Sequence, residues 1–311
     1  MNGTNPGRFR DPAVVDFGVD RTGGGRRLER LGGVLVDRPL PQCRTGMRLP
    51  TVWPEAAARY VASGDDAGAR GGWEFRRPLP DPWRVAIPVG AATLLLEVRP
   101  APSGQLGIFL EQLEQWRRLA RATAPGSRML SLFGHSGAAT LALAAAGAEV
   151  FHVDASRQAL ALARRNAEAS GLGDRPIHWI CDDAGTFVAR ELRRGRGFAG
   201  AVIDPPSWGH GPRGQPFAID RDLEPLLAAV TALVARSLPA EPGPLVLTSH
   251  SPGWHPARLR GVLDTAWREA GLPESAAIDD GPLACMDDTG RPLVLGGYAR
   301  IAPRERAAPA R

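Results

Sequence analysis

A glycine turn and an acidic residue, each placed after an apolar run, are the first features that could do chemistry. The run Met129–Phe133 breaks into Gly134–Gly137, and an alanine-rich stretch follows. A second apolar run ends at Asp154, 17 residues after Gly137 (154 − 137). This pattern predicts a strand, a tight turn, a helix and a second strand. Such a turn lets the backbone approach a ligand, and the acid can bind the two hydroxyls of a ribose.

Plainer explanations exist for each of these residues. Glycine pairs after a strand are common, so the turn alone is a weak signal. Asp154 could cap the following helix, but Ser156 already fits that role, which favours a ligand contact for Asp154. His135 is more readily explained as a turn residue than as a catalytic base.

Two further acids follow the third apolar run, Ile177–Cys181, and they are Asp182 and Asp183. One of them can accept a hydrogen bond from an adenine amino group, and Asp183 is the preferred candidate. The other can cap the next helix. The sequence does not decide which of the two acids has which role.

The segment Asp204-Pro-Pro-Ser207, at the end of the apolar run Ala201–Ile203, is the most specific of all. Consecutive prolines hold the backbone extended and remove two N–H groups, which leaves carbonyl oxygens for the site. Trp208 could stack on a planar substrate or simply form a wall. The glycine-rich stretch 209–214 predicts a mobile loop that closes over the substrate.

The elements that must position these residues alternate between helix and strand from Gln105 onward. This alternation predicts an α/β fold with a mostly parallel sheet covered on both faces. The expected strands are 128–133, 149–154, 177–181, 200–204 and 245–248, with a final β element at 293–301. The expected helices are 109–121, 138–146, 156–170, 185–194, 220–236 and 256–270.

The upstream part of the chain has a different character. Short β-favouring runs separated by glycine and proline predict a small β-rich region over residues 21–104. Residues 1–20 are expected to be a flexible tail, residues 105–303 the ligand-binding domain and residues 304–311 a second tail. The proline-rich segment Arg99–Gly104 is the expected boundary.

Composition restricts the partners only weakly. The 311-residue chain has a net charge of +5, and all 38 of its basic residues are arginine. Because lysine is absent, the arginines reflect a compositional bias in part, so the charge permits RNA binding without showing it. Cys43, Cys181 and Cys285 are too few for a disulfide framework or a zinc site. Without an apolar membrane span or a signal peptide, the chain is expected to be cytoplasmic.

In order and spacing, these segments resemble the class I S-adenosyl-L-methionine (SAM)-dependent methyltransferases. The run Leu130–Asp204 is most similar to the bacterial ribosomal RNA methyltransferase group that contains the large-subunit cytosine-C5 and guanine-N7 enzymes. That group has a glycine motif of the type Leu-x-Leu-Phe-x-x-(Ser/Thr)-Gly. Gly104–Phe109 with Glu111-Gln112 also resembles the group's segment before the first strand, which helps to cover the cofactor. The resemblance spans residues 105–295.

The resemblance implies a Rossmann-like class I methyltransferase sheet, SAM as cofactor and no metal. It places the cofactor against Phe133, Gly134, Ser136, Gly137, Asp154, Ala155, Asp182, Asp183 and Asp204. The implied catalytic residues are Asp204, Pro205, Pro206 and Ser207, where such a turn grips a planar nitrogenous substrate, and the implied substrate-binding residues are Trp208 and His250.

Two departures from the family pattern limit what is carried over. Cytosine-C5 methylation needs a cysteine thiolate that attacks the ring. Where the group would place it, this chain has Thr248-Ser-His-Ser251, and Cys181 lies on another strand. Ala138-Ala139 stands where the group usually has a further glycine. Methyl transfer to a nitrogen or oxygen is therefore favoured over transfer to a base carbon.

Three functions remain open on the sequence. The first is methylation of an RNA base, with ribosomal RNA as the expected substrate. The second is a SAM-using enzyme of specialised metabolism, acting on a small molecule by methylation, or by cyclisation or alkyl transfer from SAM itself. The third is a binding module that kept the fold and lost turnover. The fold alone does not choose among them, and the oligomeric state is not predicted.

Overall fold

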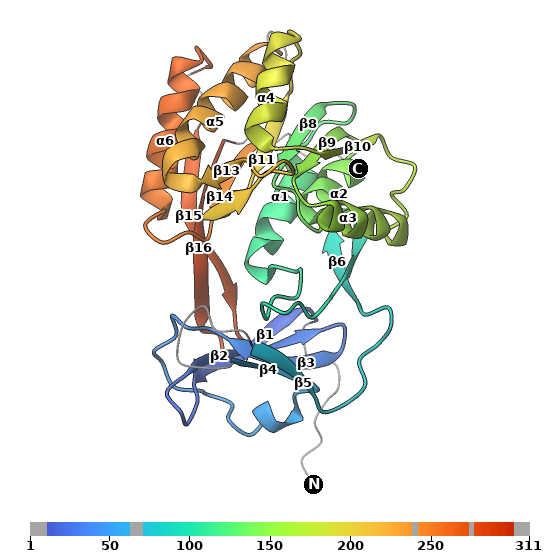
Figure 1. The fold of residues 1–311 in the computed structure, drawn as a ribbon, viewed down its shortest axis with the longest axis vertical. Helices are drawn as coiled ribbons and strands as arrows, with labels where there is room; N and C mark the ends of the chain where they lie inside the picture. Colours follow the sequence, from blue (N-terminus) through green and yellow to red (C-terminus); the bar gives the residue numbers. More distant parts are fainter. Residues whose placement is uncertain (1–10, 63–70, 238–241, 274–276, 302–311) are drawn as a thin grey trace, which may run out of the picture. The chain divides into compact units, whose positions relative to one another are not determined.

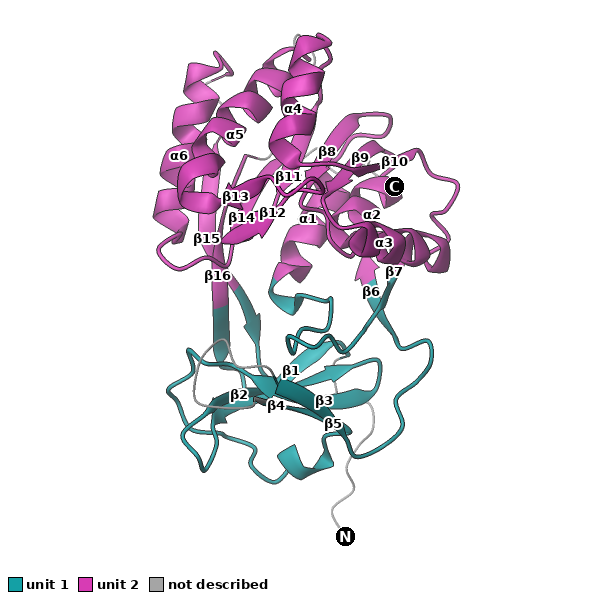
Figure 2. Cartoon of the chain, in the orientation of Figure 1, with its two compact units in different colours: residues 1–87, 95–111, 284–294 teal, residues 88–94, 112–283, 295–311 magenta. Residues whose placement is uncertain are grey.

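The chain forms two compact units (Figure 2). A computed structural model describes residues 11–62, 71–237, 242–273 and 277–301. Unit 1 comprises residues 1–87, 95–111 and 284–294, and unit 2 comprises residues 88–94, 112–283 and 295–311. The tail predicted for residues 304–311 lies outside the described residues, as do the first ten residues of the tail predicted for 1–20.

The described part of unit 2 is built on a seven-stranded sheet in the order β10-β9-β8-β11-β14-β16-β15 (Figure 1). Neighbours from β10 to β14 run parallel, whereas β16 pairs antiparallel with β14. The strand order reverses between β8 and β11, which is where ligands bind in sheets of this kind. The strands are β8 (Arg128–Leu132), β9 (Glu149–Asp154), β10 (Ile177–Cys181), β11 (Gly200–Ile203), β14 (Leu245–Ser249), β15 (Ile278–Met286) and β16 (Pro292–Ile301).

Helices cover both faces of this sheet, and successive side chains along a strand point to opposite helix groups. Leu130 and Leu132 of β8 belong to the apolar core under the second helix group, whereas Ser131 points to the first group and bonds Thr140 of α2. The first group is α1 (Leu113–Ala122), α2 (Ala138–Ala145) and α3 (Arg157–Ala169). The second is α4 (Ala184–Arg193), α5 (Ile219–Ala235) and α6 (Pro256–Glu269). No helix of the described residues has the length and apolar character to cross a membrane.

The predicted α/β sheet and N-terminal β-rich region are confirmed. Most predicted elements of unit 2 match the observed ones closely, with the largest shift at α1, which begins at Leu113 instead of residue 109. The strand β15 was not predicted, because Ile278–Met286 contains glycine, proline and two acids and lacks a clear alternation of apolar and polar residues.

Unit 1 contains a five-stranded sheet in the order β1-β2-β3-β4-β5, and the cluster Val15, Leu28, Trp53 and Ala56 forms a core against it. Its strands are β1 (Ala13–Val19), β2 (Gly25–Leu31), β3 (Val34–Pro39), β4 (Ala58–Ala62) and β5 (Gly71–Phe75). A short hairpin, β6 (Arg84–Val89) and β7 (Ala92–Glu97), and two 3-10 turns, Trp53–Glu55 and Leu110–Gln112, complete the elements up to α1.

Two predicted boundaries are wrong. Residues 13–19, expected in a tail, form the buried strand β1, because Ala-Val-Val-Asp-Phe-Gly-Val is an apolar run that satisfies its backbone against β2. The last residue of unit 1 before α1 is 111 instead of 104, residues 88–94 already belong to unit 2, and residues 284–294 return to unit 1.

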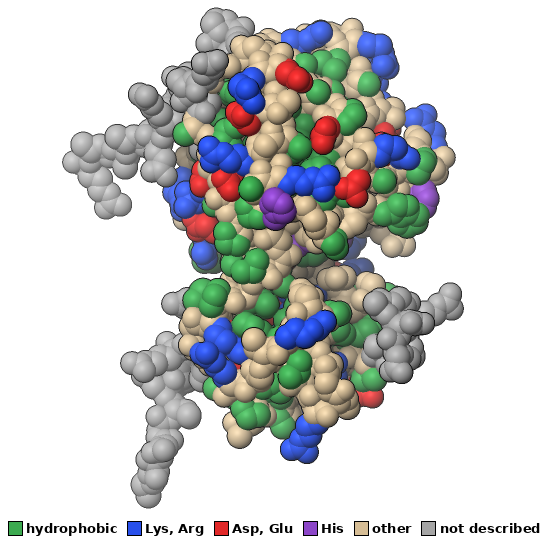
Figure 3. All heavy atoms as spheres, turned by 90° about the vertical axis from the view of Figure 1, so that its left-hand side faces the viewer, with side chains coloured by type: hydrophobic (Ala, Val, Ile, Leu, Met, Phe, Trp, Pro, Cys, Tyr) green, Lys and Arg blue, Asp and Glu red, His purple; other side chains and the backbone are tan. Residues whose placement is uncertain are grey.

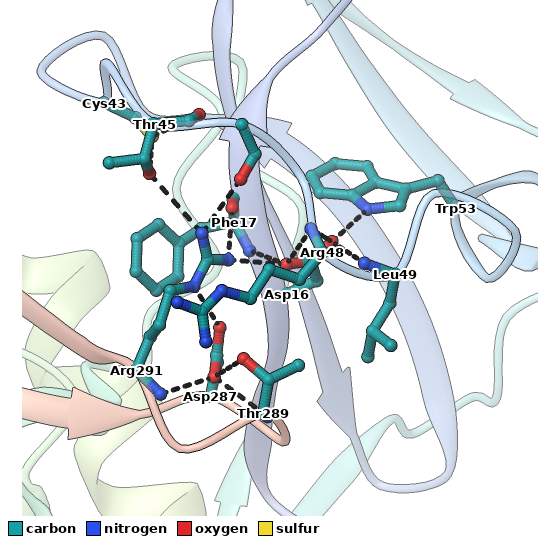
Figure 4. A network of polar contacts seen from close by, with 11 residues as sticks. Asp16, Phe17, Cys43, Thr45, Arg48, Leu49, Trp53, Asp287, Thr289 and Arg291 are labelled. Carbon is teal, nitrogen blue, oxygen red and sulfur yellow. Dashed lines mark hydrogen bonds and ion pairs between the residues drawn. The ribbon is translucent and has the colours of Figure 1, made fainter.

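A buried ionic network explains why residues 284–294 belong to unit 1 (Figure 4). The Arg291 guanidinium donates to Asp16 Oδ1 at 2.6 Å and to the Phe17 carbonyl at 2.6 Å, and its Nε donates to Asp287 Oδ2 at 2.9 Å. Asp16 also accepts the Trp53 indole N–H at 2.9 Å. Asp16 and Asp287 are both buried and therefore lack hydrating water. The hydrogen bonds from these donors compensate each carboxylate for that loss.

The first prediction concerns this network. Replacing Arg291 by methionine leaves Asp16 buried with its charge uncompensated, so the free energy of unfolding should fall by about 3–5 kcal/mol. Urea unfolding followed by tryptophan fluorescence measures it. Arg21→Met, at an exposed arginine of the β1–β2 turn, is the control and should change stability by less than about 0.5 kcal/mol. A wild-type midpoint for Arg291→Met would contradict the assigned role.

Candidate functional site at the carboxyl edge of the sheet

The turn after β8 is held in an unusual backbone conformation. Phe133 and His135 have positive φ angles of 57° and 45°, which residues other than glycine rarely adopt. Gly137 has φ 85°, and a β-carbon there would lie 2.9 Å from Ala163 Cβ of α3, so only glycine fits. The Asn166 amide donates to the Ser136 carbonyl at 2.8 Å. Backbone strain of this kind persists where the surroundings hold it, and it is typical of ligand sites.

A buried histidine that was not among the predicted site residues lies under this turn. A β-carbon on Gly134 would lie 2.4 Å from Cε1 of the His152 ring, so the ring occupies the space beneath the glycine. His152 Nδ1 lies 2.8 Å from Thr140 Oγ1, which donates to Ser131 Oγ at 3.0 Å. His152 was missed because a lone histidine in an apolar strand carries no signal of what it supports.

The second prediction follows from the charge of this histidine. Burial, helped by the nearby His135, lowers the pKa of His152 from 6.5 to about 3. Between pH 6.5 and about 3, His152 is therefore protonated in the unfolded chain and neutral in the folded chain. Because the unfolded state binds the additional proton, the free energy of unfolding should fall by up to about 1.4 kcal/mol per pH unit as the pH drops through this range. Unfolding series for wild type and His152→Gln should show a shallower slope in the variant. Equal slopes would rule the effect out.

Asp154 ends β9 and joins the turn to α3. Its Oδ2 accepts the His135 N–H at 2.9 Å, and its Oδ1 accepts the Ser156 N–H at 2.8 Å. Ser156 is the N-cap of α3 and accepts from the Ala159 N–H, as its sequence position predicted. Each carboxylate oxygen of Asp154 has a further lone pair, so this half-buried side chain is fixed in direction and can still accept from a diol. Ala155 follows it directly.

The two acids after β10 divide their roles. Asp183 is the N-cap of α4 and accepts the Thr186 N–H at 2.8 Å, whereas Asp182 is paired with Arg190 at 2.5 Å. The helix cap thus falls on Asp183, the residue preferred from the sequence for the adenine contact. Which acid meets an adenine stays a prediction.

Asp204, at the end of β11, is the most completely supported acid of the site. Its Oδ1 accepts from Thr248 Oγ1 at 2.6 Å, and its Oδ2 accepts from Gln112 Nε2 at 3.2 Å. His250 Nδ1 lies 3.8 Å from the same Oδ1. Neither Gln112 nor Thr248 was predicted from the sequence to be a site residue. Gln112 does lie in the Glu-Gln pair on which the family resemblance drew.

The segment after Asp204 forms a hairpin, and the stretch 209–214, predicted as a mobile loop, supplies the end of its first strand and most of its turn. β12 (Trp208–His210) pairs with β13 (Pro216–Ala218), and Ser207 Oγ lies 2.7 Å from Ser251 Oγ after β14. The hairpin is packed at both ends. Phe217 contacts the Phe133 ring with centroids 5.0 Å apart, and a β-carbon on Gly211 would lie 3.1 Å from that of Asp183. Trp208 is 64% exposed and meets His210 edge to face.

The topology therefore brings the predicted site residues to one edge of unit 2. The glycine turn, Asp154 and the acids after β10 follow three neighbouring strands, and Asp204–Ser207 and His250 follow the next two. The first set brings a tight glycine turn and several carboxylates together, which suits a nucleoside. The second offers a carboxylate beside an extended diproline and an exposed indole, which suits a planar group with N–H donors.

Comparison with known proteins supports this description. No family model matches the chain. Ribosomal RNA large subunit methyltransferase I of Erwinia tasmaniensis is 32% identical over 123 residues, which is 39% of this chain and 31% of that protein. Ribosomal RNA large subunit methyltransferase K of Neisseria meningitidis is 30% identical over 131 residues, or 42% of this chain and 37% of that protein. These matches span about a third of the length of the curated relatives.

Solved structures match over nearly the whole chain. The SAM-dependent methyltransferase from Agrobacterium tumefaciens has a TM-score of 0.80 and 29% identity, and the match covers 95% of this chain and 91% of that one. SMU.776, a protein solved in complex with SAH, has a TM-score of 0.66 at 15% identity over 94% of this chain and 76% of that one, a likeness that shows the fold alone. The chain thus has the Rossmann-like fold of SAM-dependent methyltransferases and resembles the large-subunit ribosomal RNA methyltransferases, as its motifs predicted.

Proposed function

We propose that the protein is a SAM-dependent methyltransferase that acts on a nitrogen, or an oxygen, of an RNA base, with ribosomal RNA as its substrate class. The observation that carries this proposal is the Asp204 carboxylate, held by Thr248 and Gln112 beside Pro205-Pro206. Such a group can orient an N–H of a planar acceptor through a charge-assisted hydrogen bond.

The first half of the site fits the cofactor. Asp154 would accept from the ribose hydroxyls, and Asp182 or Asp183 would accept from the adenine amino group. The turn Phe133–Gly137 would lie against the methionine part, because Gly134 packs on His152 and Gly137 packs on Ala163, which holds the backbone of the turn in place at this edge of the sheet. When bound, SAM supplies a methyl group already activated on a sulfonium.

The second half of the site would then need only to position the acceptor. The acceptor's lone pair forms the new bond to the methyl carbon as the carbon–sulfur bond breaks, and the sulfur keeps that electron pair. The acceptor nitrogen becomes positive and must release a proton. Asp204 stabilises this charge, and His250, whose Nδ1 lies 3.8 Å from Asp204 Oδ1, is near enough to take part in releasing the proton through one bridging water.

Cysteine positions favour nitrogen or oxygen over a base carbon. Cys181 ends β10, three strand spacings of about 4.8 Å from β11, so it lies roughly 14 Å away along the sheet. Cys43 and Cys285 belong to unit 1. Burial raises the pKa of the Cys285 thiol to about 12, so this thiol stays protonated and is not a nucleophile at neutral pH.

RNA as the acceptor is supported by the printed function of the relatives, which are ribosomal RNA methyltransferases. A cytoplasmic location would accompany such a substrate. The alternative is a small-molecule acceptor, or a reaction of SAM with itself, for which the compact region before residue 105 and the missing cysteine leave room.

Product analysis with labelled SAM tests the proposal. The protein is incubated with ribosomal RNA from a strain that lacks the gene, and both the modified nucleosides and the spent cofactor are identified by mass spectrometry. Methylated base with adenosylhomocysteine is expected. Methylthioadenosine without RNA methylation would indicate a reaction of SAM itself, and no heat on titration of SAM would remove the cofactor assignment altogether.

A further inference from the structure

Charge alone does not mark an RNA site on the face of unit 2 shown in Figure 3, where basic and acidic side chains are interspersed. In unit 2, arginines of α6 are paired with acids, as in Arg260–Asp280 at 3.0 Å and Arg268–Asp264 at 2.8 Å. A site for RNA outside the carboxyl edge of the sheet would therefore need shape and stacking in addition to charge.

Unit 1 contains a pocket with those properties. Its volume is about 480 Å³, within the range of small-ligand sites of about 300–1,000 Å³. Phe75, Arg77 and Arg99 line it together with Trp83, Glu97 and Asp81. Trp83 is buried and donates its indole N–H to the Leu31 carbonyl at 2.7 Å, so this wall is fixed. Pro78, Pro80 and Pro82 stiffen the segment that frames it.

Phe75 offers an aromatic face at this pocket. It is 56% exposed, yet it is not loose, because its ring stacks on Trp73 with an interplanar angle of 20°. Trp73 and Phe75 are two residues apart on β5 and so share one face of the strand. Trp73 meets Tyr60 of β4 edge to face, and its indole N–H donates to the Ala101 carbonyl at 2.7 Å. This row of three aromatic side chains ends at Phe75, whose exposed ring is held in position by its contact with Trp73.

The charges that line the pocket balance. Arg99 is ion-paired with the buried Glu97, and the lining holds one further residue of each charge, Arg77 and Asp81. The Arg99 side chain is 61% exposed, so it keeps donors for a ligand while Glu97 holds it in position. A neutral planar group with a polar edge suits such a lining better than a free phosphate, whose charge would find no net positive partner.

We propose that this pocket binds an unpaired base of RNA, stacked on Phe75 and contacted at its edge by Arg99. The choice of RNA rests on the proposed function, whereas the site itself rests on the pocket. Stacking on aromatic side chains is how proteins hold single-stranded bases, and it tolerates any base because each has a π-face. The pocket is thus a second contact for the RNA, separate from the residues that orient the reacting base.

Binding of a fluorescein-labelled single-stranded RNA hexamer, followed by anisotropy, tests the proposal. Phe75→Ala should weaken binding about tenfold. Met286→Ala, at another exposed apolar residue of unit 1, is the control and should change it by less than about twofold. Arg99→Gln should weaken binding, and Arg21→Gln should do so much less. The ratio of wild-type to Phe75→Ala affinity should stay constant between low and high salt, because stacking carries no charge.

Three results would overturn this proposal. They are equal affinities for Phe75→Ala and Met286→Ala, displacement of RNA by polyglutamate as readily as by unlabelled RNA, and no binding of the hexamer to the wild type. Calorimetry with SAM separates the two proposals. Phe75→Ala should bind SAM as the wild type does, because the pocket is separate from the SAM site. If the wild type itself bound no SAM, the methyltransferase proposal would fall, and the RNA measurements would still decide the pocket proposal.

Discussion

Replacing Asp204 by asparagine should lower kcat for methyl transfer by about 10²–10⁴-fold. The amide has nearly the same shape but no charge, and it presents an N–H to Thr248 or Gln112, one of which must then lose its acceptor. The nitrogen that becomes positive during transfer would lose the carboxylate that stabilises it. The affinity for SAM should fall much less, by about fivefold for one weakened hydrogen bond.

Single-turnover rates with saturating SAM, together with calorimetry, measure the two effects separately. Asp264→Asn is the matched control, because Asp264 is a surface acid of α6 that pairs with Arg268. It should leave both the rate and the affinity unchanged. If Asp204→Asn kept more than about a tenth of the wild-type rate, Asp204 would not be the group that orients the acceptor.

The sequence was sufficient for the frame of the site because that frame is local. Each predicted acid directly follows an apolar run, and the carboxyl ends of parallel strands share one edge. The Asp154 and Asp204 positions, the cap at Ser156 and the sharp turn at Gly137 all follow from neighbours within a few residues. Patterns of that range are visible in one chain.

What the sequence could not provide depends on contacts distant along the chain. Gln112 reaches Asp204 across 92 positions, and Arg291 reaches Asp16 across 275. His152 supports Gly134 because the parallel register sets β9 beside β8, and nothing in the residues around it announces this. The return of residues 284–294 to unit 1 has the same cause. The stretch 209–214 was predicted as a mobile loop, because its glycines and its proline hide the strand pairing of the hairpin 208–218.

Removing the Asp154 side chain tests the other half of the site. Asp154→Ala should raise the dissociation constant of SAM by about 100-fold, since two charge-assisted hydrogen bonds to a ribose contribute at least about 1.5 kcal/mol each. The turn should suffer as well, because His135 loses the acceptor of its N–H while its φ remains at 45°. kcat at saturating SAM should change far less, because Asp154 does not lie on the strand that positions the acceptor.

Ser156→Ala separates the ligand contact from a purely structural effect. It removes the cap of α3 and should cost about 1 kcal/mol of stability, while SAM affinity stays near the wild-type value. Calorimetry with SAM and with adenosylhomocysteine, which share the ribose, should then show the same loss for Asp154→Ala and almost none for Ser156→Ala. Equal weakening by both variants would mean that Asp154 acts only by supporting α3, and the sugar would have to be held elsewhere along the edge of the sheet.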